Sequence, residues 1–238
     1  MSVATRRPLF IIAALFGALL LLLPFSGPLF HMLFPTLDRP LYSRASFLEL
    51  TLSHVALVMA ATAAATLIGV AAGIFVTRAA GRRARPLLLA VAAIGQTFPP
   101  VAVLAIMVPI LGYGGGPTLV ALFTYALLPI IANTITGLEG IDHNVRDAAD
   151  GMGFTPTARL VQVDLPLAAP VIIAGIRTAT IINVGTATIG STVGALTLGS
   201  PIIEGLSGSN PAYIVQGALL AGLLAVLIDR SFELFAAA

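Results

Sequence analysis

Side chains that could do chemistry are few in this 238-residue chain, and one group of them lies in a polar stretch from Glu139 to Asp164. Asp147 and Asp150 are the paired carboxylates of that stretch, and two nearby carboxyl groups can perform general acid–base catalysis. Helix capping and the docking of a partner explain this pair better. Because no Ser/His/Asp arrangement can be recognised either, we predict no catalytic residue and no enzymatic activity of the chain's own.

The sequence also gives little indication that the chain binds a metal, a nucleotide or a nucleic acid. The sequence has no cysteine, and His31, His54 and His143 are too far apart for a metal-ligand spacing. It has no lysine, so a phosphate-binding loop ending in Gly-Lys-Ser/Thr is impossible. The net charge of +2 is too small to indicate nucleic acid. We predict that the chain itself binds neither a metal nor a cofactor.

A second group of polar residues and prolines interrupts apolar segments. Proline removes a helix hydrogen bond, and such breaks persist in membranes where neighbouring helices or a polar cavity satisfy the backbone. We predict that this group lines a translocation pathway, with helix–helix adhesion as the alternative for any single member. Its members are Gln96, Thr97, Pro99, Pro100, Asn133, Asn183, Thr186 and Thr188.

The elements that position these residues must be membrane helices. Hydrophobic residues make up 58% of the chain and charged residues 9%, against about 25% charged in soluble domains. A spanning helix needs about 20 mainly apolar residues. The sequence predicts an all-α membrane protein with a single transmembrane domain over 1–238. Its six spans are expected at about 8–30, 50–76, 87–111, 118–138, 165–191 and 211–227.

Arginine positions give the expected orientation. Arg6 and Arg7 precede the first span, and a cluster from Arg78 to Arg85 follows the second. The positive-inside rule places both groups in the cytoplasm. With six spans, both termini and the loop from Asp142 to Pro166 are then cytoplasmic. A cleaved signal peptide is the alternative for the first span.

The cytoplasmic loop has the sequence of two short helices around a glycine bend. Asn144 is a predicted N-cap for a helix that starts at Val145 and stops at Gly151 or Gly153. Thr155 is the predicted cap of a second helix, which is expected to end before Pro166. Two small residues, Ala148 and Ala149, would allow the groove of another protein to approach the backbone.

The same loop resembles the E-A-A-x3-G-x9-I-x-L-P motif of prokaryotic ABC importer permeases. Here it reads Asp147-Ala148-Ala149, three residues, Gly153, nine residues, Val163, one residue, and Leu165-Pro166. Every spacing agrees, and the departures are Glu to Asp and Ile to Val. The resemblance implies the type I importer permease fold. It also implies an ATPase-coupling role for Arg146, Asp147, Ala148, Ala149, Gly153, Val163, Leu165 and Pro166.

Longer segments resemble the permeases of the glycine betaine, carnitine and choline (osmoprotectant) uptake family. They are 95–114, 125–142 and 170–208. The resemblance implies a multi-pass protein of the bacterial inner membrane, surrounded by lipid. Its implied partners are ABC ATPase subunits that bind ATP and Mg²⁺, a second permease subunit and an extracytoplasmic substrate-binding protein.

Two other functions remain open at this point. The same ABC permease could serve an amino acid or another zwitterion, because substrate choice in such systems lies mostly in the binding protein. An ion-coupled secondary transporter is the other alternative. Such carriers usually hold charged residues inside their spans, and the sequence shows no carboxylate in the core of any predicted span.

Overall fold

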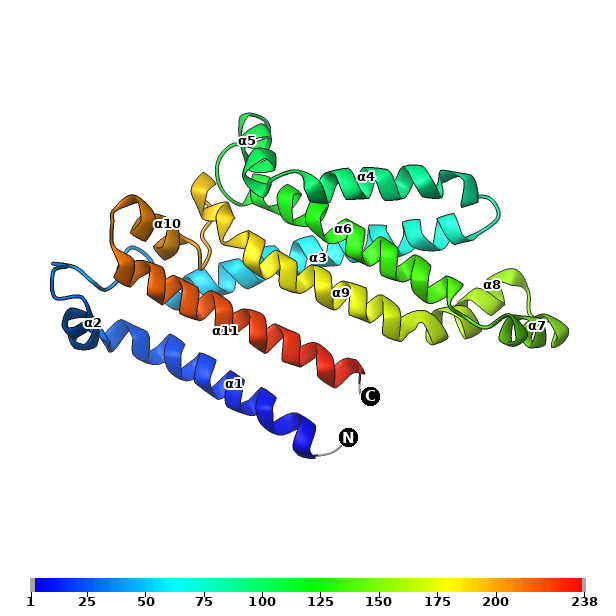
Figure 1. Ribbon diagram of the computed structural model, residues 1–238, viewed down its shortest axis with the longest axis horizontal. Helices are drawn as coiled ribbons and strands as arrows, with labels where there is room; N and C mark the ends of the chain where they lie inside the picture. The colour runs from blue at the N-terminus through cyan, green and yellow to red at the C-terminus, as the bar shows by residue number, and fades with distance from the viewer. Residues whose placement is uncertain (1–2, 237–238) are drawn as a thin grey trace. The chain divides into compact units, whose positions relative to one another are not determined.

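The computed structural model describes residues 3–236 and is helical (Figure 1). Proline at the first or second position begins several of its helices, where the missing N–H is not needed. The helices are α1 (Val3–Leu22), α2 (Gly27–Leu33), α3 (Phe47–Thr77), α4 (Arg85–Thr97), α5 (Pro100–Leu111), α6 (Gly115–Glu139), α7 (His143–Gly151), α8 (Pro156–Arg159), α9 (Leu165–Ala187), α10 (Ser200–Ser207) and α11 (Pro211–Ala236).

The helices account for the predicted spans. Within the described residues, five are long and apolar enough to cross a membrane, or six when α4 and α5 count as one broken span. Large apolar side chains on these helices are exposed, among them Phe10 (67%), Leu67 (75%) and Ile110 (68%). Such exposure fits a lipid environment, where apolar side chains need no burial within the protein. The prediction of an all-α membrane protein with about six spans is confirmed.

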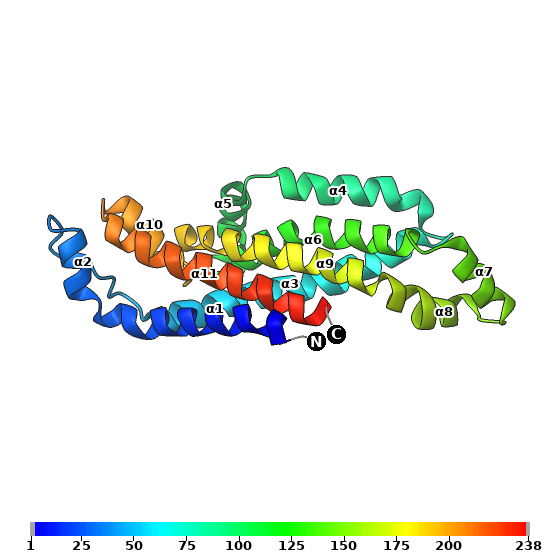
Figure 2. The same cartoon turned by 60° about the horizontal axis from the view of Figure 1, so that its bottom comes forward.

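The chain forms two compact units, of which the first comprises Met1–Ala61, Pro99–Leu122 and Thr180–Ala238. In it α11 packs along α1, as Figures 1 and 2 both show, and against α10. Its core includes Phe16, Leu50, Leu122 and Leu220. The segment before α3 is fixed by buried Gln216. The side-chain amide of Gln216 donates to the Pro40 carbonyl (2.6 Å) and accepts from the Tyr42 N–H (3.0 Å).

The second unit comprises Thr62–Phe98 and Phe123–Ala179. Small residues bring its helices together, because a Cβ at Gly73 of α3 would lie 2.7 Å from Thr134 of α6. A Cβ at Gly175 of α9 would likewise lie 2.6 Å from the Cβ of Asn133 on α6. Glycine at these positions therefore allows the helices to pack closely.

Three details of the sequence prediction are wrong. Helix α7 begins at His143 rather than Val145, because the side chain of Asp142, not of Asn144, accepts the Asn144 N–H as its cap. The second loop helix does not end before Pro166. It passes through a π-helical turn, Leu160–Asp164, directly into α9. The fourth span begins earlier than the expected residue 118, since α6 already begins at Gly115.

Candidate functional site

The loop between α6 and α9 contains the predicted coupling residues, all within the second unit. Arg146, Asp147, Ala148 and Ala149 lie on α7, Val163 lies in the π-helical turn, and Leu165 and Pro166 begin α9. Gly153 has a φ of +83°, a left-handed conformation that favours glycine, and it makes the bend between α7 and α8. Thr155 caps α8 by accepting the Ala158 N–H (3.2 Å), as the sequence predicted.

One face of α7 is open and apolar. Val145 (39% exposed), Ala148 and Met152 (71% exposed) recur at helical spacing on it. Ala149 is buried at 1%, so of the two alanines only Ala148 is accessible to a partner. Asp147 is exposed and pairs with His143 on its own helix (Nδ1 to Oδ2, 2.9 Å). A partner helix or groove can therefore meet small and flexible side chains here.

Asp164 connects this loop to the end of α3. Its carboxylate is fully buried, and Oδ2 accepts from Arg78 (3.2 Å). The Nε of Arg146, on α7, lies 3.6 Å from Oδ1, which is within ion-pair range but too long for a hydrogen bond. Arg146 also donates to the carbonyl of Leu138, at the end of α6. One buried carboxylate therefore joins α3, α7 and α9 through two guanidinium groups.

The sequence prediction overlooked Asp164, although the sequence contained a signal for it. Once the loop continues into α9 as one helix, Leu160, Asp164, Ala168 and Ile172 recur every four residues. Such residues share one helix face. Three of them pack in a single apolar cluster with Leu138. The fourth, Asp164, therefore had to be buried and paired.

The predicted pathway residues are divided between the two units. Gln96, Thr97 and Asn133 belong to the second, whereas Pro99, Pro100, Asn183, Thr186 and Thr188 belong to the first. The amide of Asn133 donates to the Pro129 carbonyl (2.8 Å), one turn earlier on α6. Asn183 is fully buried. For these eight residues the role in transport stays a prediction.

At the break between α4 and α5, the backbone carbonyl of Phe98 has a hydrogen-bond partner that the sequence prediction did not name. The hydroxyl of Tyr125, on α6, donates to the carbonyl of Phe98, which ends α4. A backbone carbonyl without a helical partner is expensive in a membrane. Tyr125 thus stabilises the chain where prolines prevent a continuous helix.

Two titratable residues of the first unit, His54 and Glu204, have structural partners there. The Nδ1 of His54, which is fully buried, accepts the Leu198 N–H (3.3 Å). Glu204 pairs with Nε of Arg44 (2.9 Å) and accepts a hydrogen bond from the Tyr42 hydroxyl (3.2 Å). Burial and the Glu204 carboxylate raise the pKa of Tyr42 to about 12.

Helical spans with a helix–glycine–helix loop define a membrane transport component of the ABC importer type. Residues 65–238 match the family described as binding-protein-dependent transport system inner membrane component, and the chain belongs to this family. The fold resembles that of the MetNI methionine ABC transporter in an inward-facing conformation. The TM-score is 0.71 at 24% identity, covering 82% of this chain and 98% of the other.

Named relatives are more similar to this chain in sequence. The choline transport system permease protein OpuBB of Bacillus subtilis (strain 168) is 41% identical over 75% of this chain and 82% of its own length. The osmoprotectant import permease protein OsmY of Salmonella typhimurium is 38% identical over 76% of this chain and 77% of its own length. The sequence-based assignment to this permease family is confirmed.

Proposed function

We propose that this chain is the membrane-spanning subunit of an ABC importer for osmoprotectants such as glycine betaine, choline or a related quaternary amine. The observation that carries the proposal is the α7–Gly153–α8 loop, with its open apolar face, in a chain whose relatives are osmoprotectant permeases. The whole chain acts as one permease domain, with the loop 142–166 as its coupling element and both termini in the cytoplasm.

In this proposal the energy comes from separate ATPase subunits that bind ATP and Mg²⁺. An ATPase groove receives the α7 face of Val145, Ala148 and Met152. Asp164 then transmits the movement of α7 to the ends of α3 and α9, because its carboxylate pairs with Arg78 and Arg146. A second permease subunit completes the passage, and an extracytoplasmic binding protein delivers the solute.

The path of the solute is proposed along the neutral polar residues of α4, α6 and α9. Amide and hydroxyl groups bind a quaternary ammonium weakly, which favours release. Selectivity then belongs to the binding protein, where aromatic faces can hold the cation. This chain contains no tryptophan and four tyrosines, one of which, Tyr42, is engaged with Glu204.

The test is uptake into proteoliposomes that contain this chain, its ATPase and its binding protein. Radiolabelled glycine betaine, choline, carnitine and methionine are compared with and without ATP. We expect ATP-dependent uptake of the quaternary amines and none of methionine. Uptake without the ATPase subunits would instead establish an ion-coupled carrier, and uptake of methionine alone would change the substrate class.

Gly153→Pro tests the coupling element in the same assay. Proline fixes φ near −65° and cannot adopt the +83° found at Gly153, so the bend is lost. We expect ATP-driven uptake to fall at least about tenfold, with Gly151→Ala as the control because a Cβ at Gly151 meets no atom within 4 Å. Uptake at the wild-type rate in Gly153→Pro would show that the bend is not the coupling device.

A further inference from the structure

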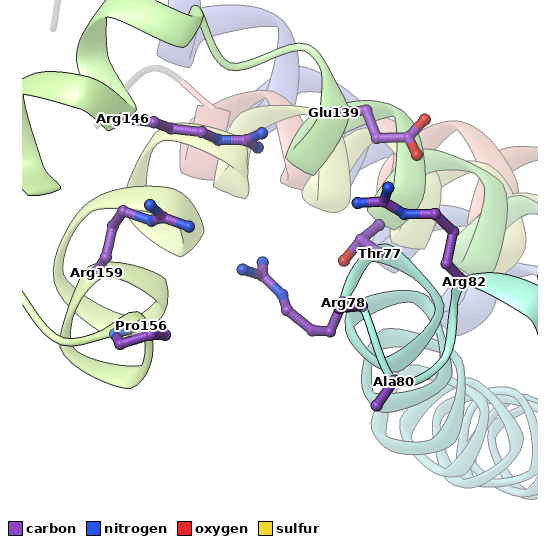
Figure 3. Close-up of a pocket in the computed structure, with 9 residues that line it drawn as sticks. Thr77, Arg78, Ala80, Arg82, Glu139, Arg146, Pro156 and Arg159 are labelled. Atoms are coloured by element: carbon purple, nitrogen blue, oxygen red, sulfur yellow. The ribbon is translucent and has the colours of Figure 1, made fainter.

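A cavity of about 570 Å³ lies in the second unit where α3, α7 and α8 end or begin. Its lining includes four arginines, Arg78 and Arg82 from the segment after α3, Arg146 from α7 and Arg159 from α8. Figure 3 shows the guanidinium groups of Arg78, Arg146 and Arg159 directed into one shared space. The coupling role proposed above accounts for Arg78 and Arg146 only as partners of Asp164.

The arginines have donors that the described residues leave unused. The Nε of Arg78, of Arg146 and of Arg159 is buried and has no hydrogen-bond partner among the described residues. A buried donor without an acceptor costs about 1–3 kcal/mol, and more when it is charged. The Nε of Arg146 faces Oδ1 of Asp164 at 3.6 Å, whereas the guanidinium ends of Arg78, Arg146 and Arg159 face the shared space (Figure 3), where an anion can reach them.

The charges around the cavity also do not balance. Each carboxylate there already faces an arginine: Asp164 faces Arg78 and Arg146, Asp150 pairs with Arg159, and Glu139 pairs with Arg85 (2.5 Å). Five arginines (78, 82, 85, 146 and 159) therefore stand against three carboxylates (139, 150 and 164), which leaves two positive charges in excess. An acceptor with up to two negative charges fits this excess.

We infer that this cavity binds a phosphate-bearing anion. Several oxygens around one phosphorus can accept from diverging guanidinium groups at once, and arginine is the side chain best shaped for phosphate. The cavity is in the size range of small-ligand sites. It lies directly after Thr77, where the apolar helix α3 ends, so a lipid headgroup can reach it as well as a free phosphate ion.

The experiment uses the full-length chain purified in detergent, and it separates the two sources. In one arm, the unfolding temperature is measured with inorganic phosphate and with chloride at equal ionic strength. In the other, the chain is transferred into vesicles of phosphatidylcholine alone or with phosphatidylglycerol, extracted, and examined for retained lipid by native mass spectrometry. Variants Arg159→Gln and Arg82→Gln remove lining charges, and Arg83→Gln removes an exposed arginine outside the lining.

We expect the wild type and Arg83→Gln to be stabilised by phosphate or to retain phosphatidylglycerol, whichever source applies. Arg159→Gln should bind the phosphate group about tenfold more weakly, since it loses one charge-assisted hydrogen bond. Arg82→Gln should weaken this binding by a smaller factor, because the side chain of Arg82 is exposed. Asp150→Asn frees Arg159 from its carboxylate and should strengthen binding, a gain that misfolding cannot imitate.

Two outcomes would overturn the inference. One is the absence of any phosphate-specific stabilisation and of retained phosphatidylglycerol in the wild type. The other is equal binding in the wild type, Arg159→Gln and Asp150→Asn.

Discussion

Asp164 is the residue on which the geometry of the coupling loop depends most. Its carboxylate is fully buried, whereas the side chains of Arg78 and Arg146 are 29% and 31% exposed. Taking a charge out of water is costly unless a partner is held in place, so removing one member of such a pair leaves the other charge uncompensated. The stability of this region therefore depends on a single acidic side chain.

Asp164→Asn tests this dependence. We expect the free energy of unfolding to fall by about 2 kcal/mol, less than for a fully buried pair because both arginines are partly exposed to solvent. Denaturant unfolding of the detergent-solubilised chain measures the change. Asp147→Asn is the control, since Asp147 is exposed and its partner, His143, lies on the same helix. Equal unfolding midpoints for the two variants would contradict a structural role for the buried carboxylate.

Tyr42 gives a pH-dependent prediction in the segment before α3. Burial and Glu204 raise the pKa of Tyr42 from 10.0 to about 12 in the folded state. The folded chain therefore holds this proton more tightly than the unfolded chain. The stabilisation is complete below pH 10 and is lost as the pH rises through about 12.

Unfolding measured between pH 9 and 12 checks this prediction, with Tyr42→Phe as the comparison. Phenylalanine keeps the ring, which meets Tyr213 edge-on at a centroid distance of 5.4 Å, but has no proton to lose. We expect the wild type to lose more stability over this interval than Tyr42→Phe. The same slope in both proteins would show that the proton of Tyr42 is not linked to folding.

At the scale of helices, glycines set how closely α6 and α9 approach. A Cβ at Gly175 would lie 2.6 Å from Asn133 Cβ and 2.8 Å from the Pro129 carbonyl oxygen, and the backbone cannot move aside cheaply. A Cβ at Gly185, on the same helix, meets nothing within 4 Å. The two positions therefore form a matched pair for measuring packing in the membrane.

We expect Gly175→Ala to destabilise the chain by about 1–3 kcal/mol, as overpacking does. Gly185→Ala should be neutral or slightly stabilising, because alanine is the better helix former. Thermal unfolding in one detergent compares the two variants directly. A Gly175→Ala variant as stable as Gly185→Ala would mean that α9 can shift away from α6 without cost.

These elements also show what the sequence could and could not reveal. Hydropathy located the spans because each is a long, mainly apolar run, and the double proline at 99 and 100 located the break before α5. Motif spacing located the loop and its bend at Gly153. The sequence did not predict the π-helical turn, because a proline such as Pro166 normally marks a helix boundary. Here Pro166 lies at the second position of α9.

The cap of α7 and the burial of Asp164 were missed for different reasons. Asp142 and Asn144 are both good N-caps two residues apart, and local sequence does not choose between them. Asp164 looked like part of a solvated loop because its partners lie 86 and 18 residues away in sequence. Contacts between residues so far apart in sequence depend on how α3 and α7 pack. The hydrophobic periodicity of a single segment gives no information about that packing.

At the scale of the whole molecule, the π-helical turn fixes the direction in which the docking loop faces. A π-helical turn holds one more residue than an α-helical turn, and such turns often occur at functional positions. Leu160–Asp164 is the segment between α8 and α9, so it sets the rotation of α7 and α8 about the axis of α9. Its length also keeps Val163 and Leu165 ten and twelve residues beyond Gly153.

Deleting Val161 tests whether this rotation matters for transport. The side chain is 57% exposed, so its loss removes little packing, but the deletion takes out the extra residue of the π-helical turn and so changes how α8 is joined to α9. We expect the spans to stay folded, while ATP-driven uptake into proteoliposomes with the ATPase and binding protein falls to the level without ATP. Val161→Ala, which keeps the residue count, should retain most uptake. If the deletion variant also transports at the wild-type rate, the orientation of α7 does not control coupling, and the connection between ATPase and spans must run through another contact.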